Sequence, residues 1–449
     1  MNEPHKMTAG QLRREIREGR VGVEELTRHF LARIEKYDGV DGLNTIAELD
    51  ASAVAQARAM DARPAHEREK LPLFGLPILV KDNVDVAGLH TTAGSLSLAD
   101  NVAAADAPIV ANLRRNGAVI LGKTNLTEFA NYTTKGMPNG YSSRGGQVKN
   151  AYDSAGDPGG SSSGSAVAVS AGFCAAAVGT DTSFSVVGCA THNGVAGLKP
   201  PHGALSGRGI VPISHTLDSA GALARDFSDA LLLYAGMRDT PLPAVTPADP
   251  AELRIAVNTF DRDQVSEAQR ARYEALFDAL RGAGASFSQG SHAHAAAQGD
   301  IMRCEFRHDL EDYLRSSSAR RKTLAEIVAH YESDPARMMK YGITNLRAAL
   351  DEASGRLDDP PYLNAMSERE IRRARVLEDL RGFDACVMTG PTNVMHFTGL
   401  PSVALKLCMG DDRVPRGIIL YGADETRLYA AALTIEKHCA DVSFPPLEA

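Results

Sequence analysis

Apolar residues recur along this chain with two different periods. Residues 8–36 place apolar side chains at every fourth position with charged residues on the other face, a pattern typical of amphipathic helices. The short apolar runs at 76–80 and 118–122 are typical of buried strands, and residues 106–116 between them have a helical pattern. Because short buried strands alternate with helices, we expect an α/β fold with a mixed central β-sheet flanked by helices.

The second half of the chain has a different pattern. The stretch from about 250 to 375 is rich in Arg, Glu and Ala with helical periodicity, so we expect a helical layer packed on the core. The residues after it return to short apolar runs and end in a helix from about residue 424. We therefore expect a single domain over 1–449, with its core formed by about 65–240 and 380–449.

The composition is that of a globular protein with a mildly acidic balance. Hydrophobic residues make up 44%, and 48 basic against 56 acidic side chains give a net charge of −8, which weighs against a nucleic-acid partner. The six cysteines show no C-x-x-C spacing and fit a reducing compartment. The first 20 residues lack the apolar segment of a secretory signal, and no apolar run is long enough to span a bilayer. We expect a cytoplasmic protein with no membrane partner.

A lysine at the end of an apolar run is the first candidate for chemistry. Lys81 follows the run at 76–80 and precedes Asp82 and Asn83, which can end a strand. A lysine at such a position is most often exposed. If the strand directs it inward instead, desolvation lowers the pKa of its amine, which can then accept a proton near neutral pH.

The second candidate is the Gly/Ser run at residues 159–165. It contains G-x-S-x-G centred on Ser162, the pattern of the nucleophile elbow in α/β-hydrolases, but that elbow directly follows a strand and here a turn-like 157–159 precedes the run. A phosphate-binding Walker A loop needs a lysine that the run lacks, and a flexible linker is disfavoured by the apolar helical pattern that follows at once. The interpretation that is left is a loop at a helix N-terminus, where backbone N–H groups favour developing negative charge.

A third segment, residues 179–185, is a turn-like run that ends in a serine and is weak evidence alone. Together with the other motifs it resembles the amidase signature family, over essentially the whole chain. The motifs that carry the resemblance occur in order at 75–83, 122–130, 159–172, 179–182, 197–201 and 218–221 with 224–225. Segments at 144–147, 209–214, 305–306 and 313–314 are most similar to the peptide-amidase branch.

The resemblance implies an amidase signature fold and a Ser–cis-Ser–Lys triad that hydrolyses a carboxamide. Lys81 would be the base, Ser161 the bridging serine after a cis peptide bond, and Ser185 the nucleophile, with the family's separation of 24 residues between the serines. A serine hydroxyl is a weak nucleophile until a neighbouring base takes its proton, which a neutral Lys81 can do through Ser161. The other expected site residues would bind the oxyanion or the substrate, and they are Gly160, Thr182, Ser183 and Phe184.

One departure from the family pattern concerns the residues around the nucleophile. Family members carry a small residue before it and often Ile-Arg after it, whereas this chain has Phe184 before Ser185 and Val186-Val187 after it. If position 184 requires a positive φ, a bulky residue there is strained. A degenerate member of the family that acts as a binding protein is therefore one alternative to an amidase.

The expected ligands and partners are few. We expect no cofactor and no metal, because the histidines do not cluster at metal spacing, and His292 with His294 fits an exposed loop. The expected partner is a small-molecule or peptide amide substrate, and the sequence leaves a homodimer open. A second alternative for the function is an ammonia-generating amidotransferase subunit, which would need partner chains.

Overall fold

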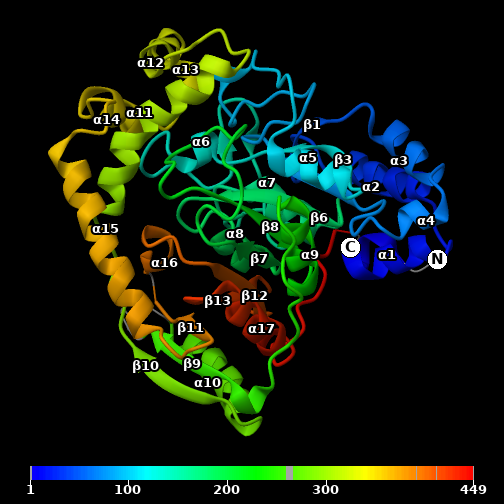
Figure 1. The fold of residues 1–449 in the computed structure, drawn as a ribbon. Helices are drawn as coiled ribbons and strands as arrows, with labels where there is room; N and C mark the ends of the chain where they lie inside the picture. Colours follow the sequence, from blue (N-terminus) through cyan, green and yellow to red (C-terminus); the bar gives the residue numbers. More distant parts are fainter. Residues whose placement is uncertain (1–2, 259–265, 391, 411, 448–449) are drawn as a thin grey trace.

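A computed structural model describes residues 3–258, 266–390, 392–410 and 412–447. It contains one eleven-stranded sheet in the order β1-β3-β2-β6-β8-β7-β12-β13-β11-β9-β10 and a two-stranded sheet, β4-β5 (Figure 1). The strands are β1 (Ile46–Leu49), β2 (Pro77–Lys81), β3 (Val119–Thr124), β4 (Tyr141–Ser142), β5 (Gly146–Gln147), β6 (Ala176–Asp181), β7 (Ala196–Lys199), β8 (Ser219–Ala224), β9 (Arg254–Asn258), β10 (Ser286–Gly290), β11 (Ala385–Met388), β12 (Ser402–Met409) and β13 (Pro415–Tyr421). The expected mixed α/β fold is confirmed.

The large sheet is mixed, and its parallel part brings functional strand ends together. β2 lies between β3 and β6 and is parallel to both, with Lys81 opposite Thr124 of β3 and Val80 opposite Val178 of β6. β6 then pairs antiparallel with β8. Because β2 and β6 run in the same direction, their carboxyl ends, Lys81 and Asp181, lie at the same edge of the sheet.

Helices cover the sheet along its length. They are α1 (Ala9–Arg17), α2 (Val23–Tyr37), α3 (Ala53–Asp61), α4 (Ala65–Arg68), α5 (Pro108–Arg115), α6 (Glu128–Asn131), α7 (Ser163–Ser170), α8 (Val187–Asn193), α9 (Phe227–Met237), α10 (Glu267–Gly282), α11 (Gln298–Ser316), α12 (Leu324–Ser333), α13 (Pro335–Met338), α14 (Thr344–Asp351), α15 (Pro360–Asp379), α16 (Val394–Phe397) and α17 (Glu425–Glu436), with short 3-10 turns at Pro4–Lys6, Leu96–Leu98 and Pro250–Glu252. Within the described residues, no helix is both long enough and apolar enough to cross a bilayer.

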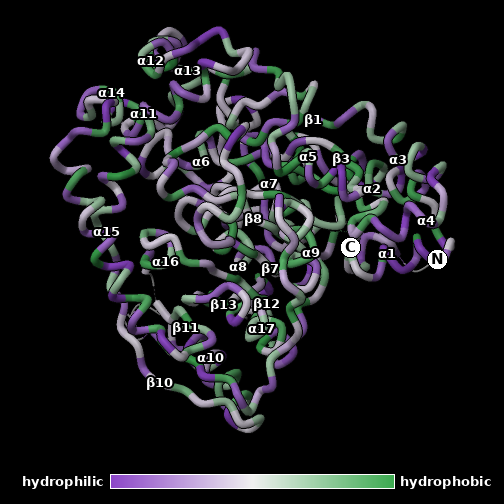
Figure 2. Tube along the Cα trace, viewed as in Figure 1, coloured by the Kyte–Doolittle hydropathy of each residue, from purple (hydrophilic) through white to green (hydrophobic). Residues whose placement is uncertain are grey.

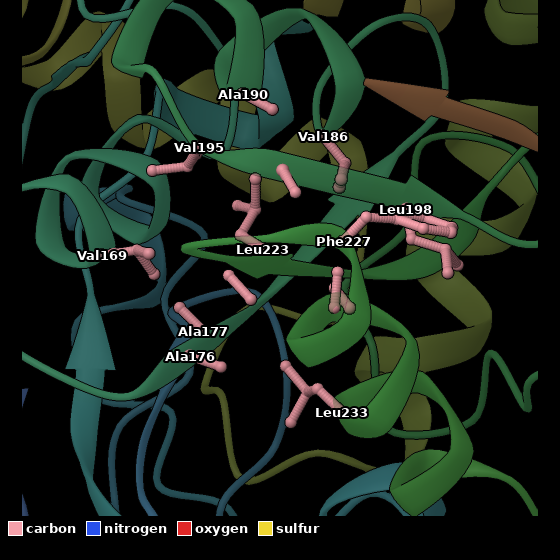
Figure 3. Packing of buried hydrophobic residues seen from close by; sticks show 14 of the residues in the cluster. Val169, Ala176, Ala177, Val186, Ala190, Val195, Leu198, Leu223, Phe227 and Leu233 are labelled. Carbon is pink, nitrogen blue, oxygen red and sulfur yellow. The ribbon is translucent and has the colours of Figure 1, made fainter. Parts of the chain in front are cut away.

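The main core lies where the central strands pack against α7, α8 and α9. Side chains from β6, β7, β8 and these helices interdigitate there (Figure 3), and they include Val169, Ala177, Val186, Leu198 and Leu223. All of them are fully buried. α7 is buried on every side, which explains why its sequence is apolar without a polar face. The loops that carry the expected serines are thus anchored on rigid, buried elements.

The region expected to be a helical layer differs in its first part. Residues 250–290 contribute β9 and β10, which extend the large sheet, on either side of α10. The helices α11 to α15 follow and form the outer layer on one side of the molecule (Figure 1). α15 is amphipathic, so hydrophilic and hydrophobic residues alternate along the helix (Figure 2). The sequence pattern did not predict these two short strands, because the helical periodicity of α10 between them dominates the region. β10 in addition is mostly exposed and carries only one large apolar residue, Phe287.

Candidate active site

Lys81 is buried at the end of β2 and faces a group of hydroxyls. Its Nζ lies 2.8 Å from the Oγ of Ser161, 2.9 Å from the Oγ of Ser162 and 2.9 Å from the Oγ1 of Thr180. The backbone oxygen of Thr180 is 3.3 Å away. Solvent does not reach the lysine at all. The strand therefore directs Lys81 inward, and the exposed alternative for this residue does not apply.

The environment of Lys81 favours the neutral amine more than water does. Burial lowers its pKa to about 8, because the charged form loses its hydration. Cys189, Asp181 and Asp218 act in the opposite direction and keep the pKa of Lys81 from falling further. An amine with this pKa is neutral in a useful fraction of molecules near neutral pH and can accept a proton.

The Gly/Ser run brings Ser161 to the lysine, and its next residue, Ser162, contacts the backbone of Ser185. The peptide bond between Gly160 and Ser161 is cis, as the resemblance implied. The N–H of Ser162 donates to the carbonyl of Ser185 over 3.2 Å, so the run and the loop after β6 lie against each other. α7 begins inside this run, at Ser163, whereas residues 157–162 form no strand, which argues against the hydrolase elbow.

Gly160 lies in a close approach between two segments. A Cβ at this position would lie 2.2 Å from the Oδ1 of Asn139 and 2.9 Å from the Oγ1 of Thr127. Any side chain would push one of these residues away. The glycine thus allows the backbone before Ser161 to pass close to its neighbours.

The loop from Thr182 to Val186 presents Ser185 between β6 and α8. Asp181 organises this loop, because its Oδ2 accepts the N–H groups of Val186 at 2.7 Å and Val187 at 3.1 Å. Thr182 is held from outside, since its hydroxyl donates to the Oδ1 of Asp218 over 2.5 Å. Ser185 is 5% exposed, so its hydroxyl is nearly enclosed.

Phe184 has a positive φ of +66°, the condition under which a bulky residue at this position is strained. Its N–H donates to the Nε2 of His396 over 3.2 Å. The rings of the two residues meet edge to face with centroids 4.4 Å apart. The N–H that we expected among the oxyanion donors is therefore engaged by a histidine in this structure.

Three neighbouring backbone N–H groups differ from that of Phe184, which donates to His396. Within the described residues, the N–H groups of Thr182, Ser183 and Ser185 have no hydrogen-bond acceptor. Buried backbone N–H groups are nearly always paired, and unpaired ones are expected where a ligand or intermediate supplies the acceptor. The loop thus offers three backbone donors within the four residues that end in Ser185.

A cavity lies next to this site, and its lining residues include neither Lys81 nor Ser185. It has a volume of about 490 Å³ and borders both Thr180 and Asp218. Thr180 contacts the Nζ of Lys81, and Asp218 holds Thr182. Burial raises the pKa of Asp218 to about 6, although three hydrogen bonds to its carboxylate oppose this change.

The structure differs in part from what the sequence predicted for the histidines. His292 is buried, with its Nδ1 2.7 Å from the hydroxyl of Tyr421, so the expectation of an exposed loop was wrong for it. In the described part of the chain, His215, His308 and Asp309 form the one group with metal-like spacing. The Nδ1 atoms of both histidines already lie 2.9 Å from the Oδ1 of Asp309, which satisfies them by hydrogen bonding.

Several residues of the site were not identified from the sequence as participants. Ser162 lies inside the Gly/Ser run and Thr180 inside the motif at 179–182, so their contacts with Lys81 could have been suspected. Asp181 lies in the same motif as Thr180. His396 is 212 residues from its partner Phe184 and sits in no motif, so only the folded chain identifies it.

The family of the protein follows from comparisons with known sequences. The profile of the Amidase family matches residues 25–396. The chain belongs to this family. A probable amidase of Arabidopsis thaliana is 40% identical over 243 residues, which are 53% of this chain and 47% of that protein. A glutamyl-tRNA(Gln) amidotransferase subunit of Lysinibacillus sphaericus is 31% identical over an alignment of 486 positions that covers 96% of both chains.

Comparison with solved structures supports the same family and confirms the amidase signature fold. The peptide amidase of Stenotrophomonas maltophilia superposes with a TM-score of 0.90 at 29% identity, and the match covers 99% of both chains. A peptide amidase has also been solved in complex with the competitive inhibitor chymostatin, and it superposes with a TM-score of 0.89. By sequence, however, the chain spans only about half the length of several curated relatives, 47% of the first and 58% of a second, from Deinococcus radiodurans.

Proposed function

We propose that the protein is a serine-type amidohydrolase that cleaves the C–N bond of a carboxamide through an acyl-enzyme on Ser185. Ser161 and Lys81 act as the proton relay and the base. The observation that carries this proposal is the buried Lys81, whose Nζ contacts the Oγ of Ser161 at 2.8 Å and whose pKa is lowered to about 8. Membership of the Amidase family supports it independently.

The hydrogen bonds around Lys81 suggest how the relay is oriented. A neutral amine has two N–H donors and one lone pair. The Oγ of Ser162 accepts from Lys81 while its own hydroxyl donates to the carbonyl of Thr180 over 3.1 Å, and the Oγ1 of Thr180 is a second acceptor. These two acceptors occupy both N–H donors and leave the lone pair for the hydroxyl proton of Ser161.

The reaction then proceeds in two halves. Ser185 Oγ forms a bond to the amide carbon while its proton passes to Ser161, and the proton of Ser161 passes to Lys81. The C–N bond breaks as the relay returns a proton to the leaving nitrogen, which departs as ammonia or an amine. Water then attacks the acyl-enzyme, again losing a proton to the relay, and the acid and free Ser185 are released.

The negative charge on the amide oxygen needs donors during both halves. The N–H groups of Thr182, Ser183 and Ser185 are our candidates, because they have no acceptor in the described chain. One such donor is typically worth about 3 kcal/mol of transition-state stabilisation. This proposal narrows the set of oxyanion-binding residues that the sequence predicted, which was Thr182, Ser183, Phe184 and Gly160. Phe184 and Gly160 would shape the backbone of the site and would not donate a hydrogen bond to the oxyanion.

We propose an amide of peptide-like size as the substrate class. The cavity of about 490 Å³ lies in the range of sites that enclose small ligands. The structurally similar peptide amidase binds chymostatin, which supports the same class for this chain. A metal or an organic cofactor has no step in this scheme, and we propose that the protein works as a cytoplasmic enzyme without nucleic acid.

The test is ammonia release from a panel of amides. The panel contains C-terminally amidated peptides, free glutamine and simple aliphatic carboxamides, and ammonia is followed by a coupled assay. The proposal predicts turnover of at least one amide by the parent and none by Ser185→Ala. Equal ammonia release by both proteins would contradict it.

An amidotransferase component is the second candidate function. The observation that favours it is the relative in Lysinibacillus sphaericus, which aligns over 96% of both chains. In that case the same triad would release ammonia from an amide donor, and the ammonia would pass to a partner chain. Glutamine as the preferred amide in the panel, together with activity that rises on adding a partner chain, would support this second candidate.

A further inference from the structure

A buried histidine connects the nucleophile loop to the C-terminal part of the chain. His396 lies on the short helix α16 (Val394–Phe397) and is inaccessible to solvent. Its Nε2 accepts the N–H of Phe184, the residue directly before the proposed nucleophile. The two rings also pack edge to face. A contact of this kind can control where Ser185 lies without touching the substrate.

The contact requires one particular form of the histidine. Nε2 can accept a hydrogen bond only if it carries no proton, so the proton of the neutral ring is on Nδ1. Nδ1 lies 3.2 Å from the Oδ1 of Asp181, an electrostatic contact between two fully buried side chains. Burial lowers the pKa of His396 to about 4, although Asp181 acts to raise it. The histidine is therefore neutral at ordinary pH.

Asp181 links this histidine to the other side of the loop. While its Oδ1 faces His396, its Oδ2 holds the N–H groups of Val186 and Val187. The residues on both sides of Ser185 are thus fixed by one carboxylate and one imidazole. Ser185 lies between two held backbone positions.

The same C-terminal segment also reaches the start of the loop. The Nε2 of Gln298 donates to the carbonyl of Thr182 over 3.3 Å, and the Oε1 of Gln298 accepts from the Nδ2 of Asn393 over 2.6 Å. Asn393 is the residue before α16. Residues 393–396 therefore hold Thr182 indirectly and Phe184 directly.

Phe184 needs such support because its backbone is unfavourable for a residue with a side chain. A left-handed conformation is unfavourable for an L-residue, because its Cβ lies too close to the following carbonyl oxygen. A buried acceptor for its N–H offsets part of this cost and fixes the orientation of the peptide between Ser183 and Phe184. With that peptide fixed, the N–H groups of Thr182, Ser183 and Ser185 keep their own directions.

We propose that His396 is a positioning residue, which acts as a neutral hydrogen-bond acceptor to hold Phe184 in its left-handed conformation and thereby place Ser185 and the oxyanion donors. The effect of His396 on catalysis rests on the proposed amidase function, whereas its hold on the loop does not.

The test compares two substitutions that differ in one property. His396→Gln keeps an acceptor, its Oε1, at similar reach, and His396→Leu fills similar volume without one. We expect His396→Leu to lower kcat about a hundredfold with little change in KM, since small displacements of a nucleophile cost this much, and His396→Gln to retain most of the activity. A Leu variant as active as the Gln variant would overturn the proposal, as would a folded Gln variant as inactive as Leu.

Hydrogen exchange gives a readout that needs no activity. In His396→Leu, backbone amides of the peptide spanning residues 182–188 should exchange faster than in the parent, and in His396→Gln they should exchange at the parent rate. This readout holds even if no amide is turned over, so failure of the proposed function and failure of this inference are distinguishable. Unchanged exchange in the Leu variant would overturn the proposal.

A matched control and a double variant complete the design. His292 is a second buried histidine with a side-chain partner, the hydroxyl of Tyr421, and lies outside the site. His292→Leu should lower Tm without the loss in kcat. In a Phe184→Gly background, where glycine adopts the left-handed conformation freely, His396→Leu should cost less kcat than in the parent. An equal cost in both backgrounds would show that His396 does not act through Phe184.

Discussion

The Nζ of Lys81 lies 2.8 Å from the Oγ of Ser161, and both side chains are completely buried. A lysine in this position has exchanged its hydration for three hydroxyl groups and a carbonyl. The loss of hydration turns an ordinary cation into a base. The roles proposed for the remaining site residues depend on this pair.

The pH dependence of the reaction follows from this burial. Lys81 accepts a proton only when neutral, and its pKa is lowered to about 8, so kcat should rise as the pH rises through about 8 and level off above it. The Lys81→Ala variant should lose several orders of magnitude in kcat, with a smaller loss at high pH where hydroxide replaces the base. A parent profile that is flat from about pH 5 to 9, with chemistry limiting, would contradict a lysine base.

Substituting the nucleophile should remove activity and leave the fold intact. Ser185 lies in a loop after β6, and its contact with the Gly/Ser run uses the backbone carbonyl, which accepts from Ser162, rather than the hydroxyl. We expect Ser185→Ala to have a Tm within a few degrees of the parent and no measurable turnover. Residual activity within about tenfold of the parent would remove Ser185 from the role of nucleophile.

Phe184→Gly separates two roles of the aromatic ring. The ring is half-buried, packs against the core and meets His396, which favours a packing role. Glycine relieves the strain at φ +66° but leaves a cavity, and for a half-buried ring we expect a net destabilisation of about 1–3 kcal/mol. Thermal unfolding and selectivity across acyl groups of increasing size are measured on the same variant. A gain for bulky acyl groups with unchanged Tm would instead place the ring in the substrate pocket.

Gly160→Ala tests the close approach beside Ser161. The added Cβ would meet the Oδ1 of Asn139 and the Oγ1 of Thr127, and this threonine hydroxyl also accepts the N–H of Gly140. We expect a lower Tm and a slower reaction of Ser185, because displacing these residues shifts the backbone that carries Ser161.

Gly164→Ala is the control variant, because it introduces a steric clash in the same Gly/Ser run. Its added Cβ would meet backbone atoms of Asn125 and Thr45. This glycine lies in α7, after the serines that contact Lys81. We expect Gly164→Ala to lower Tm as well. For each degree by which Tm falls, however, it should lose less activity than Gly160→Ala does. Equal losses of activity per degree of Tm in the two variants would deny Gly160 any special role.

Much of the fold could be predicted from local patterns. The amphipathic helices near the N-terminus and the apolar strands β2 and β3 have strong periodicity, and the structure contains them within a few residues of the expected bounds. β9 and β10 could not be recognised, because they lie beside a strongly helical segment and gain their stability from pairing with β11 and with each other. Strand pairing between distant segments leaves little trace in a single sequence.

The candidate site shows the same division. Lys81, Ser161 and Ser185 lie in recognisable motifs, and Phe184, with its positive φ, stands out as a departure from one of them. His396 could not be predicted, since a lone histidine far along the chain has no pattern that connects it to Phe184. Its role depends on a hydrogen bond to a backbone N–H, and every residue except proline offers such a donor, so the sequence does not mark the partner.

Covalent labelling by a fluorophosphonate identifies the nucleophile and its base in one measurement. Only an activated serine reacts rapidly with this reagent. The parent is incubated with the reagent at pH 8, digested, and analysed by mass spectrometry, with Lys81→Ala as the control that lacks the base. We predict one label per chain, on Ser185, and a much slower reaction in the control. A label on Ser161 or Ser162, or a parent that reacts no faster than Lys81→Ala, would contradict the proposed triad.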